Sequence, residues 1–362
     1  MSDDDARQLG ANDSHKKGVV RALRIHAEEV ESRSDLEMPP EVRDSLDILR
    51  DACGPNLVAV IFFGSLLLGT SPDSGSAADL FVIVDDYHDF YRDVGYRLPA
   101  ARRAGIMAVL NRILPPNIIH LQDPADLKTG AKCFVISKSD IAVALSRRAP
   151  DHFCHGRLVQ RVHIVHARSA EDREKIEQRL ETARRASLDW VPLYLGDVFS
   201  VNEYCSRMLE VSYLSEIRPE TRERVHEVVS AQQTYFRLMY GRILEEAVTA
   251  GKLKQITGGY SLTIRPTRVQ RLRWRWFFAR SKIRATMRWL KYMLTFDDWL
   301  DYIARKAERR TGVQLKLSRA ERRMPVLLIW PKAIRVLRAM RSPTRTSQPH
   351  DDDAVEQDRG PR

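Results

Sequence analysis

Gly64, Ser65 and Asp79 are the residues of this sequence whose types and spacing could carry out chemistry. Gly64-Ser65 follows the apolar, β-branched run 57–63, and Asp79 stands directly before a second such run, 80–84. A strand that ends in a small Gly-Ser turn offers backbone N–H groups to a phosphate, especially where a helix begins. A carboxylate on the neighbouring strand can then hold a divalent metal against that phosphate. The structural alternative is an ordinary turn at Gly64-Ser65 and a strand-start cap at Asp79.

The composition indicates a globular chain with an anionic partner. The 362 residues are enough for two domains, and the formal net charge is +11. This charge favours a nucleotide, a nucleic acid or an anionic lipid surface without choosing among them. The four cysteines lack CxxC or Cys/His metal spacing, which indicates a reducing compartment and no zinc site. From the acidic, polar start and the absence of an apolar run of about 20 residues, we expect neither a secretory signal nor a membrane span.

Strand and helix patterns alternate in the first half of the chain. The predicted elements are strands over 57–63, 80–84, 117–121, 132–137 and 159–165, and helices over 19–30, 41–49, 100–114 and 140–147. This alternation predicts an α/β domain with one mixed sheet. From residue 169 the apolar spacing becomes helical, with predicted helices over 171–190, 202–217 and 220–247 and a small strand over 260–264. We therefore place a domain boundary near residue 168.

The last third of the chain is basic and aromatic. Within 271–294, one helical stripe contains Leu272, Trp276, Ala279, Ile283, Met287, Leu290 and Leu294. Three interpretations stay open: a core helix of the second domain, contact with a membrane interface, or binding of single-stranded nucleic acid. The segment 324–341 has Pro331 at a predicted helix start and basic residues on one side. It predicts a short amphipathic helix that either lies in the plane of a membrane or docks on its own domain.

Four ordered stretches resemble one known family. They are FGS at 63–65, ADLFVIVDD at 78–86, Tyr87-His88, and the pair AKCFVIS at 131–137 with HGRLVQRV at 155–162. Together they are similar to the mitochondrial-type phosphatidate cytidylyltransferases, the CDP-diacylglycerol synthases of the translocator assembly and maintenance family. By this resemblance the chain is identified as a divergent, bacterial-type member of the nucleotidyltransferase superfamily.

The resemblance implies a fold and a reaction. The expected fold class is α+β: a nucleotidyltransferase-like mixed-sheet α/β domain at 16–168, a mainly helical domain at 169–318 and a basic amphipathic helix at 319–341. Residues 1–15 and 342–362 are expected to be disordered. The implied reaction transfers CMP from CTP to phosphatidic acid and gives CDP-diacylglycerol and pyrophosphate. We expect a cytoplasmic protein at the inner face of the cell membrane, held to the anionic surface by the C-terminal helix, and infer no obligate protein partner.

The resemblance also gives each candidate residue a role. The implied catalytic residues are Asp79, Ser65 and Lys132. The implied nucleotide- and phosphate-binding residues are Gly64, Ser65, Lys132, Arg157 and Arg161, the arginines because a guanidinium suits bidentate contact. The implied cofactor is Mg²⁺, with Asp79 as a ligand; Asp73 is the second ligand that we infer from the loop before Asp79, not from the resemblance.

The second carboxylate is where the sequence departs from the pattern of nucleotidyltransferases, which carry two carboxylates two residues apart. Ala77 occupies the first of these positions. Asp85 has the strand parity of Asp79, but six residues at about 3.3 Å each separate the two by about 20 Å, too far to share a metal. Asp73, in the loop before Asp79, is the better candidate. Because of Ala77, two alternatives stay open: a catalytically impaired module that binds lipid or RNA, and a nucleotidyltransferase with another acceptor.

Overall fold

The computed structural model describes residues 38–70, 77–95, 103–122, 130–215 and 222–295. All of them belong to one compact unit of the chain, Met1–Phe296. The predicted helices at 19–30 and 319–341, the predicted disordered ends and Asp73 lie outside the described residues.

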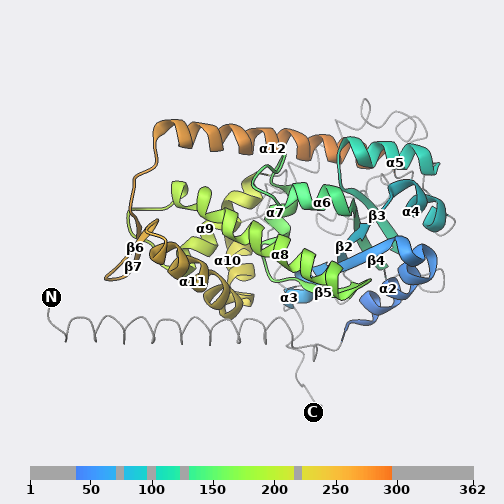
Figure 1. Cartoon of the computed structure of the whole chain (residues 1–362), viewed down its shortest axis with the longest axis horizontal. Coiled ribbons are helices and arrows are strands. Elements are labelled where there is room, and N and C mark those ends of the chain that lie inside the picture. The colour runs from blue at the N-terminus through green and yellow to red at the C-terminus, as the bar shows by residue number, and fades with distance from the viewer. Residues whose placement is uncertain (1–37, 71–76, 96–102, 123–129, 216–221, 296–362) are drawn as a thin grey trace, which may run out of the picture. The chain divides into compact units, whose positions relative to one another are not determined.

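A five-stranded mixed sheet organises the first half of the chain and lies on one side of the described structure, beside the helical part (Figure 1). Its strands are β1 (Leu57–Phe63), β2 (Ala78–Val84), β3 (Asn117–Gln122), β4 (Gly130–Ser137) and β5 (His163–Ala167). Their order is β3-β4-β2-β1-β5, in which β2 and β4 pair in parallel and the other neighbours pair antiparallel. This sheet confirms the predicted α+β class with one mixed sheet.

Helices cover both faces of the sheet. The helices of the first half of the chain are α2 (Pro40–Cys53), α3 (Ser65–Leu68), α4 (Tyr87–Val94), α5 (Ala104–Ile113), α6 (Lys138–Ala144) and α7 (Phe153–Leu158). Side chains of α2, α4 and α5 pack on the face that carries Leu80 and Val82. The opposite face, with Phe81 and Ile83, packs against α6, α7 and the helices that follow β5. Successive strand residues thus serve two separate cores, because neighbouring side chains in a strand point to opposite faces.

The helical part follows β5. It contains α8 (Ala170–Ala186), α9 (Val201–Leu214), α10 (Arg222–Ala231) and α11 (Gln233–Thr249), with short 3₁₀ turns at Gly54–Asn56, Ser187–Asp189 and Val191–Tyr194. The prediction of one continuous helix over 220–247 is wrong at Gln232, whose backbone is not helical. The Gln232 side chain instead accepts a hydrogen bond from the Arg161 backbone N–H at 3.0 Å, which ties the break to the sheet domain.

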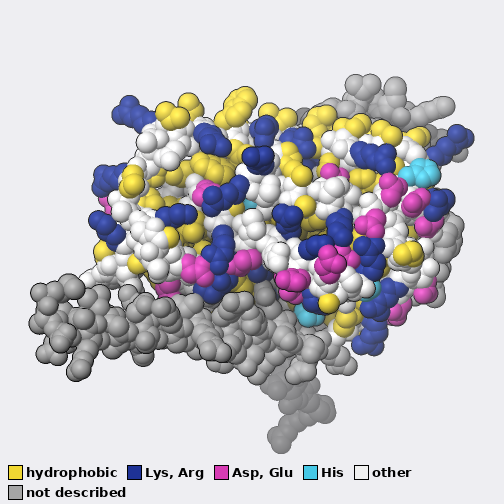
Figure 2. Space-filling view, viewed as in Figure 1, with side chains coloured by type: hydrophobic (Ala, Val, Ile, Leu, Met, Phe, Trp, Pro, Cys, Tyr) yellow, Lys and Arg dark blue, Asp and Glu magenta, His cyan; other side chains and the backbone are white. Residues whose placement is uncertain are grey.

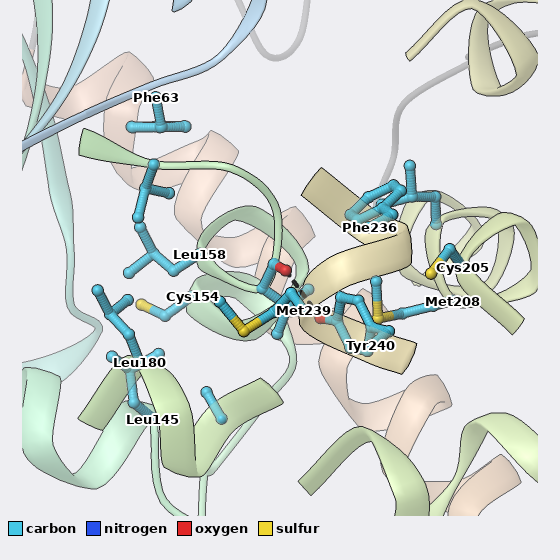
Figure 3. Close-up of a cluster of buried hydrophobic side chains, with 14 of the residues drawn as sticks. Phe63, Leu145, Cys154, Leu158, Leu180, Cys205, Met208, Phe236, Met239 and Tyr240 are labelled. Atoms are coloured by element: carbon cyan, nitrogen blue, oxygen red, sulfur yellow. Dashed lines mark hydrogen bonds between the residues drawn. The ribbon is translucent and has the colours of Figure 1, made fainter. Parts of the chain in front are cut away.

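A single hydrophobic cluster joins the sheet to the helical part (Figure 3). It runs from Phe63 on β1 through Cys154 on α7 to Met208 on α9 and Tyr240 on α11. The Tyr240 hydroxyl donates to the Val159 carbonyl oxygen at 2.8 Å within this cluster. The core is therefore continuous across residue 168, and the division there into two domains stays a prediction.

A hairpin and one long helix complete the described chain. The hairpin pairs β6 (Leu253–Ile256) with β7 (Gly259–Leu262), and α12 spans Arg268–Thr295. Near its end, α12 is fixed to the sheet domain by Arg288, which donates to the Pro115 carbonyl oxygen, and by Lys291, which donates to the Pro116 carbonyl oxygen at 3.1 Å. Since both side chains are buried, these contacts set which face of α12 points inward.

Candidate active site

Gly64 places the start of α3 against the carboxylate of Asp79. Gly64 has φ +90°, ψ −166°, a conformation that essentially only glycine adopts. A Cβ added at Gly64 would lie only 2.5 Å from Asp79 Oδ2. Glycine is thus required here both for the turn and for the close approach of the carboxylate. The predicted pair, Gly64-Ser65 and Asp79, does meet in space.

One row of side chains crosses the sheet at this level. In register, Phe63 of β1 lies opposite Asp79 of β2, Asp79 opposite Lys132 of β4, and Lys132 opposite His120 of β3. Residues that pair in this way project to the same face of a sheet. The row lies at the edge of the sheet that is formed by strand ends, because β2 and β4 both begin there and β1 ends there. Asp79 and Lys132 are half-buried at this edge.

Three phenylalanines, one of them in the row itself, form an apolar floor next to Asp79 and Lys132. The rings of Phe63, Phe81 and Phe134 have centroids 5.1–5.3 Å apart. Lys132 Nζ lies 5.0 Å from the centroid of the Phe134 ring. The floor holds the Lys132 ammonium beside low-dielectric surface, where its charge acts more strongly on an anion than it would in water.

Arg157 is more deeply buried than we expect of a residue that contacts substrate at the edge of the sheet. Its guanidinium carbon lies 5.6 Å from the Phe134 centroid and 3.7 Å from the Phe153 centroid, and Nη1 donates to the Phe153 carbonyl oxygen at 2.9 Å. The side chain is only 7% exposed. Arg157 therefore adds positive charge beneath the floor, on the same ring that Lys132 contacts.

Arg161 lies at the same edge as Gly64, although not on a strand. The predicted strand over 159–165 is wrong in its first half, since β5 begins at His163. His163 pairs with Phe62 across the antiparallel β1–β5 ladder. Arg161, two residues earlier, is thus level with the end of β1, and its side chain is half-buried.

Two site residues were not found from the sequence. His120 joins the row only because β3 pairs with β4. The alternating pattern of β3 shows which face His120 is on, but its neighbour cannot be identified without the strand order. Arg224 of α10 donates from Nη1 to the Thr70 carbonyl oxygen at 2.9 Å and from Nη2 to Thr70 Oγ1 at 3.2 Å. Arg224 thereby fixes Thr70, which follows the α3 turn. The Thr70 backbone N–H in turn donates to the Ser65 carbonyl oxygen. No local pattern links positions 70 and 224.

The acidic residues at the other end of β2 have structural partners. Asp85 forms an ion pair with Arg168. Asp86 caps α4 by accepting from the backbone N–H groups of Asp89 and His88, and these bonds, with Arg112, lower the pKa of its carboxyl. His88 is exposed there, 3.9 Å from Asp89. The exclusion of Asp85 as a partner of Asp79 agrees with this placement.

A buried ionic cluster lies behind the Phe134 floor. Asp151 accepts from Arg284 at 2.6 Å and from Arg288 at 2.7 Å. Burial by itself raises the pKa of the Asp151 carboxyl, but the two guanidiniums hold it below its ordinary value. Burial also lowers the pKa of His152 well below its ordinary value and that of His155 to about 4. Both imidazoles are therefore neutral at physiological pH, and Asp151 is the counter-ion of the two α12 arginines.

The donor set at Asp79 fits a magnesium ion that is bound together with a nucleotide. Among the described residues, no group of three or more His, Cys, Asp or Glu side chains could hold a metal by itself. Mg²⁺, however, keeps several waters and uses one or two carboxylates together with substrate phosphates. The Asp79 carboxylate lies directly against the Gly64 turn, with too little space between them even for a Cβ. This is the turn that would hold those phosphates.

Part of the chain matches a known protein family. Residues 131–269 match the family described as "Phosphatidate cytidylyltransferase, mitochondrial". This match confirms the family resemblance. The matched segment begins at β4, includes Lys132, Arg157 and Arg161, and extends through the helical part to the start of α12. The Gly64-Ser65 and Asp79 stretches precede the matched segment, so the argument for their roles depends on their geometry.

No curated protein matches the chain significantly. Among the helices that the structure describes, none is both long and apolar enough to cross a bilayer.

Proposed function

We propose that this chain is a phosphatidate cytidylyltransferase, which transfers CMP from CTP to phosphatidic acid. The observation that carries the proposal is the row of Asp79 and Lys132 beside the Gly64 turn, within a chain whose residues 131–269 match that family. A phosphate oxygen of phosphatidate attacks the α-phosphorus of CTP and forms the new P–O bond. The bond from the α-phosphorus to the bridging oxygen breaks, and pyrophosphate leaves with its electron pair.

The chain's own residues position the phosphates and neutralise charge, which is most of what such a transfer requires. The backbone N–H groups at the start of α3 and the Ser65 hydroxyl hold the triphosphate. Lys132, on the neighbouring strand, contacts the phosphate of the nucleotide or of the lipid. Arg161, two residues before β5, lies at the same edge and offers a bidentate contact. Arg157, enclosed between Phe134 and Phe153, contributes positive potential from below.

Asp79 is the proposed ligand of Mg²⁺, with Asp73 as a proposed second ligand. When bound, Mg²⁺ supplies charge neutralisation on the phosphate oxygens as pyrophosphate leaves. Asp79 also keeps the Gly64 turn in place, because its carboxylate fills the space beside that residue.

The lipid acceptor implies work at a membrane surface, and we propose the inner face of the cell membrane. The segment 319–341 is the proposed anchor, since its basic side attracts anionic lipid and its apolar residues enter the interface.

One assay tests the proposed function. The purified full chain is given Mg²⁺, phosphatidate in detergent micelles, and each of the four labelled nucleoside triphosphates in turn. The proposal expects CDP-diacylglycerol and pyrophosphate with CTP. Turnover with a different acceptor would reassign the substrate. No turnover with any nucleotide, together with saturable binding of vesicles or RNA, would support a catalytically impaired module, the reading that Ala77 favours.

A further inference from the structure

The apolar stripe of α12 points away from the protein. Its members recur at spacings of three, four and seven residues, which places them on one face of the helix. They are Val269, Leu272, Trp276, Ile283, Met287 and Leu290, and each is between 36% and 75% exposed. We call this face the α12 stripe. A surface helix ordinarily turns such a stripe toward its core.

The opposite face of α12 is held inward by polar contacts. Arg288 pairs with Asp151, Lys291 donates to carbonyl oxygens beyond the end of α5, and Ser281 Oγ accepts from the His152 backbone N–H at 3.0 Å. Rotating the helix to bury the stripe would break these bonds and leave the buried Asp151 carboxylate without its counter-ions, a costly change. The outward direction of the stripe is therefore fixed by the structure.

Basic side chains flank the α12 stripe. Arg271, Arg275 and Lys282 lie on one side of it and Arg273 and Arg280 on the other, all exposed. No acidic residue occurs anywhere in α12. An apolar strip between two rows of cations is the pattern of a helix that lies in the headgroup region of an anionic bilayer, where the aliphatic side chains enter the lipid and the cations stay at its surface.

The neighbouring helix α5 extends this surface. Ile106, Val109 and Ile113 share one face of α5 and are 49–69% exposed. The buried residues of α5 are instead Met107, Ala108 and Asn111. Hydrophobic and basic side chains alternate along the edge where α12 and α5 lie (Figures 1 and 2).

We propose that the α12 stripe, continued by the exposed face of α5, docks on an anionic lipid bilayer. Charge decides against a second copy of the chain, because two such basic faces would repel each other. Side-chain type favours lipid over RNA, because base stacking needs aromatic rings and Trp276 is the one aromatic member of the α12 stripe and the exposed face of α5; the other exposed tryptophan of α12, Trp289, lies off the stripe. This docking surface rests on the proposed function in one respect, namely that a phosphatidate acceptor would be found in a bilayer.

Docking in this way brings the bilayer near the candidate active site. The ring of Tyr292, in the last turns of α12, lies 6.3 Å from the ring of His120. His120 belongs to the row that also contains Lys132 and Asp79. The helix that lies on the lipid thus ends beside the residues that would receive a lipid phosphate.

A site-specific fluorophore tests the proposal. All four native cysteines are buried, so an Ile283→Cys variant of the full chain can be labelled at one exposed thiol with an environment-sensitive dye. The matched control is Leu214→Cys, at the end of α9, where the leucine is 73% exposed. Vesicles of phosphatidylcholine and phosphatidylglycerol are then added without nucleotide. We expect a blue shift and brighter emission at position 283, no change at 214, and no response to vesicles of phosphatidylcholine alone.

Several results would overturn the proposal. They are no shift at 283, an equal shift at 214, or a shift with an RNA oligonucleotide in place of vesicles. A dye at 283 that is already shielded without vesicles would mean that another part of the chain, or a second copy, covers the stripe.

A charge-adding variant gives an independent test. Ile283→Lys/Met287→Lys removes two apolar side chains and raises the positive charge, and Leu214→Lys is its control. We expect the double variant to bind the anionic vesicles about tenfold more weakly or worse, because each buried aliphatic side chain contributes more than the added charge. Equal or tighter binding would show a purely electrostatic surface and contradict the proposal.

Activity on detergent-dispersed phosphatidate separates this proposal from the proposed function. The double variant should keep the wild-type rate in micelles. A blue shift in a chain without activity would leave the docking surface intact, whereas activity without the blue shift would overturn the docking surface alone.

Discussion

Replacing Gly64 by alanine tests whether the close approach of the turn to Asp79 matters for activity. The new Cβ would lie 2.5 Å from Asp79 Oδ2, whereas an ordinary contact begins at 3.4 Å. The carboxylate or the turn must therefore shift by about 1 Å, and a displacement of about 1 Å can cost about 100-fold in rate. Alanine in this backbone conformation also costs about 1–3 kcal/mol of stability.

Gly69→Ala is the matched control for this strain. Gly69 has φ +66°, and a Cβ there would meet nothing within 4 Å. It should lose about 1–2 kcal/mol of stability and keep most of its activity. The free energy of unfolding is measured by urea titration, and CDP-diacylglycerol formation by transfer of label from CTP. If Gly64→Ala retained the activity of Gly69→Ala, the close approach would have no catalytic consequence and this reasoning would fail.

Three further predictions address other parts of the account. Lys132→Met should lower kcat/KM by about 100-fold with little change in stability, because it removes a charged donor to phosphate from the row; an unchanged kcat/KM would contradict that role. Arg224→Ala should raise the KM for CTP by about tenfold with a smaller change in kcat, because the loss of its two bonds to Thr70 loosens the α3 turn; an unchanged KM would show that the turn needs no support from α10. His155→Gln should weaken the pH dependence of stability, because the imidazole binds a proton below about pH 6.5 in the unfolded chain and only near pH 4 in the folded one. Between pH 7.5 and 5.0 this difference should lower the free energy of unfolding of the wild type by about 2 kcal/mol, a loss that the variant avoids. Urea titrations of both proteins at the two pH values measure it.

The sheet and the main contact of the site could be predicted because both follow from local pattern. The runs 57–63 and 80–84 are long, apolar and β-branched, and a buried strand is the structure that suits them. Since Gly64 ends the first run and Asp79 begins the second, antiparallel pairing alone brings the two together. Lys132 required the family resemblance, because its parallel pairing with Asp79 depends on a strand order that the sequence does not state.

Other features depend on tertiary contacts that no local pattern reports. The stripe of α12 has the spacing of a buried face, yet buried Arg288 and Lys291 hold the opposite face inward. Arg157 has the type of an edge residue that binds phosphate, but it is enclosed between two phenylalanine rings. The break at Gln232 coincides with a hydrogen bond that its side chain accepts from Arg161, far away in the sequence.

The central claim is that Asp79 takes part in a Mg²⁺-dependent transfer of CMP to phosphatidate. The most direct test compares CDP-diacylglycerol formation by the wild type and by Asp79→Asn, with and without Mg²⁺, after circular dichroism and urea titration have shown that both are folded. Asparagine preserves the shape of the side chain and removes its charge, so the account predicts a loss of about 1,000-fold and strict Mg²⁺ dependence in the wild type. Full activity of Asp79→Asn, or turnover by the wild type without a divalent metal, would contradict it.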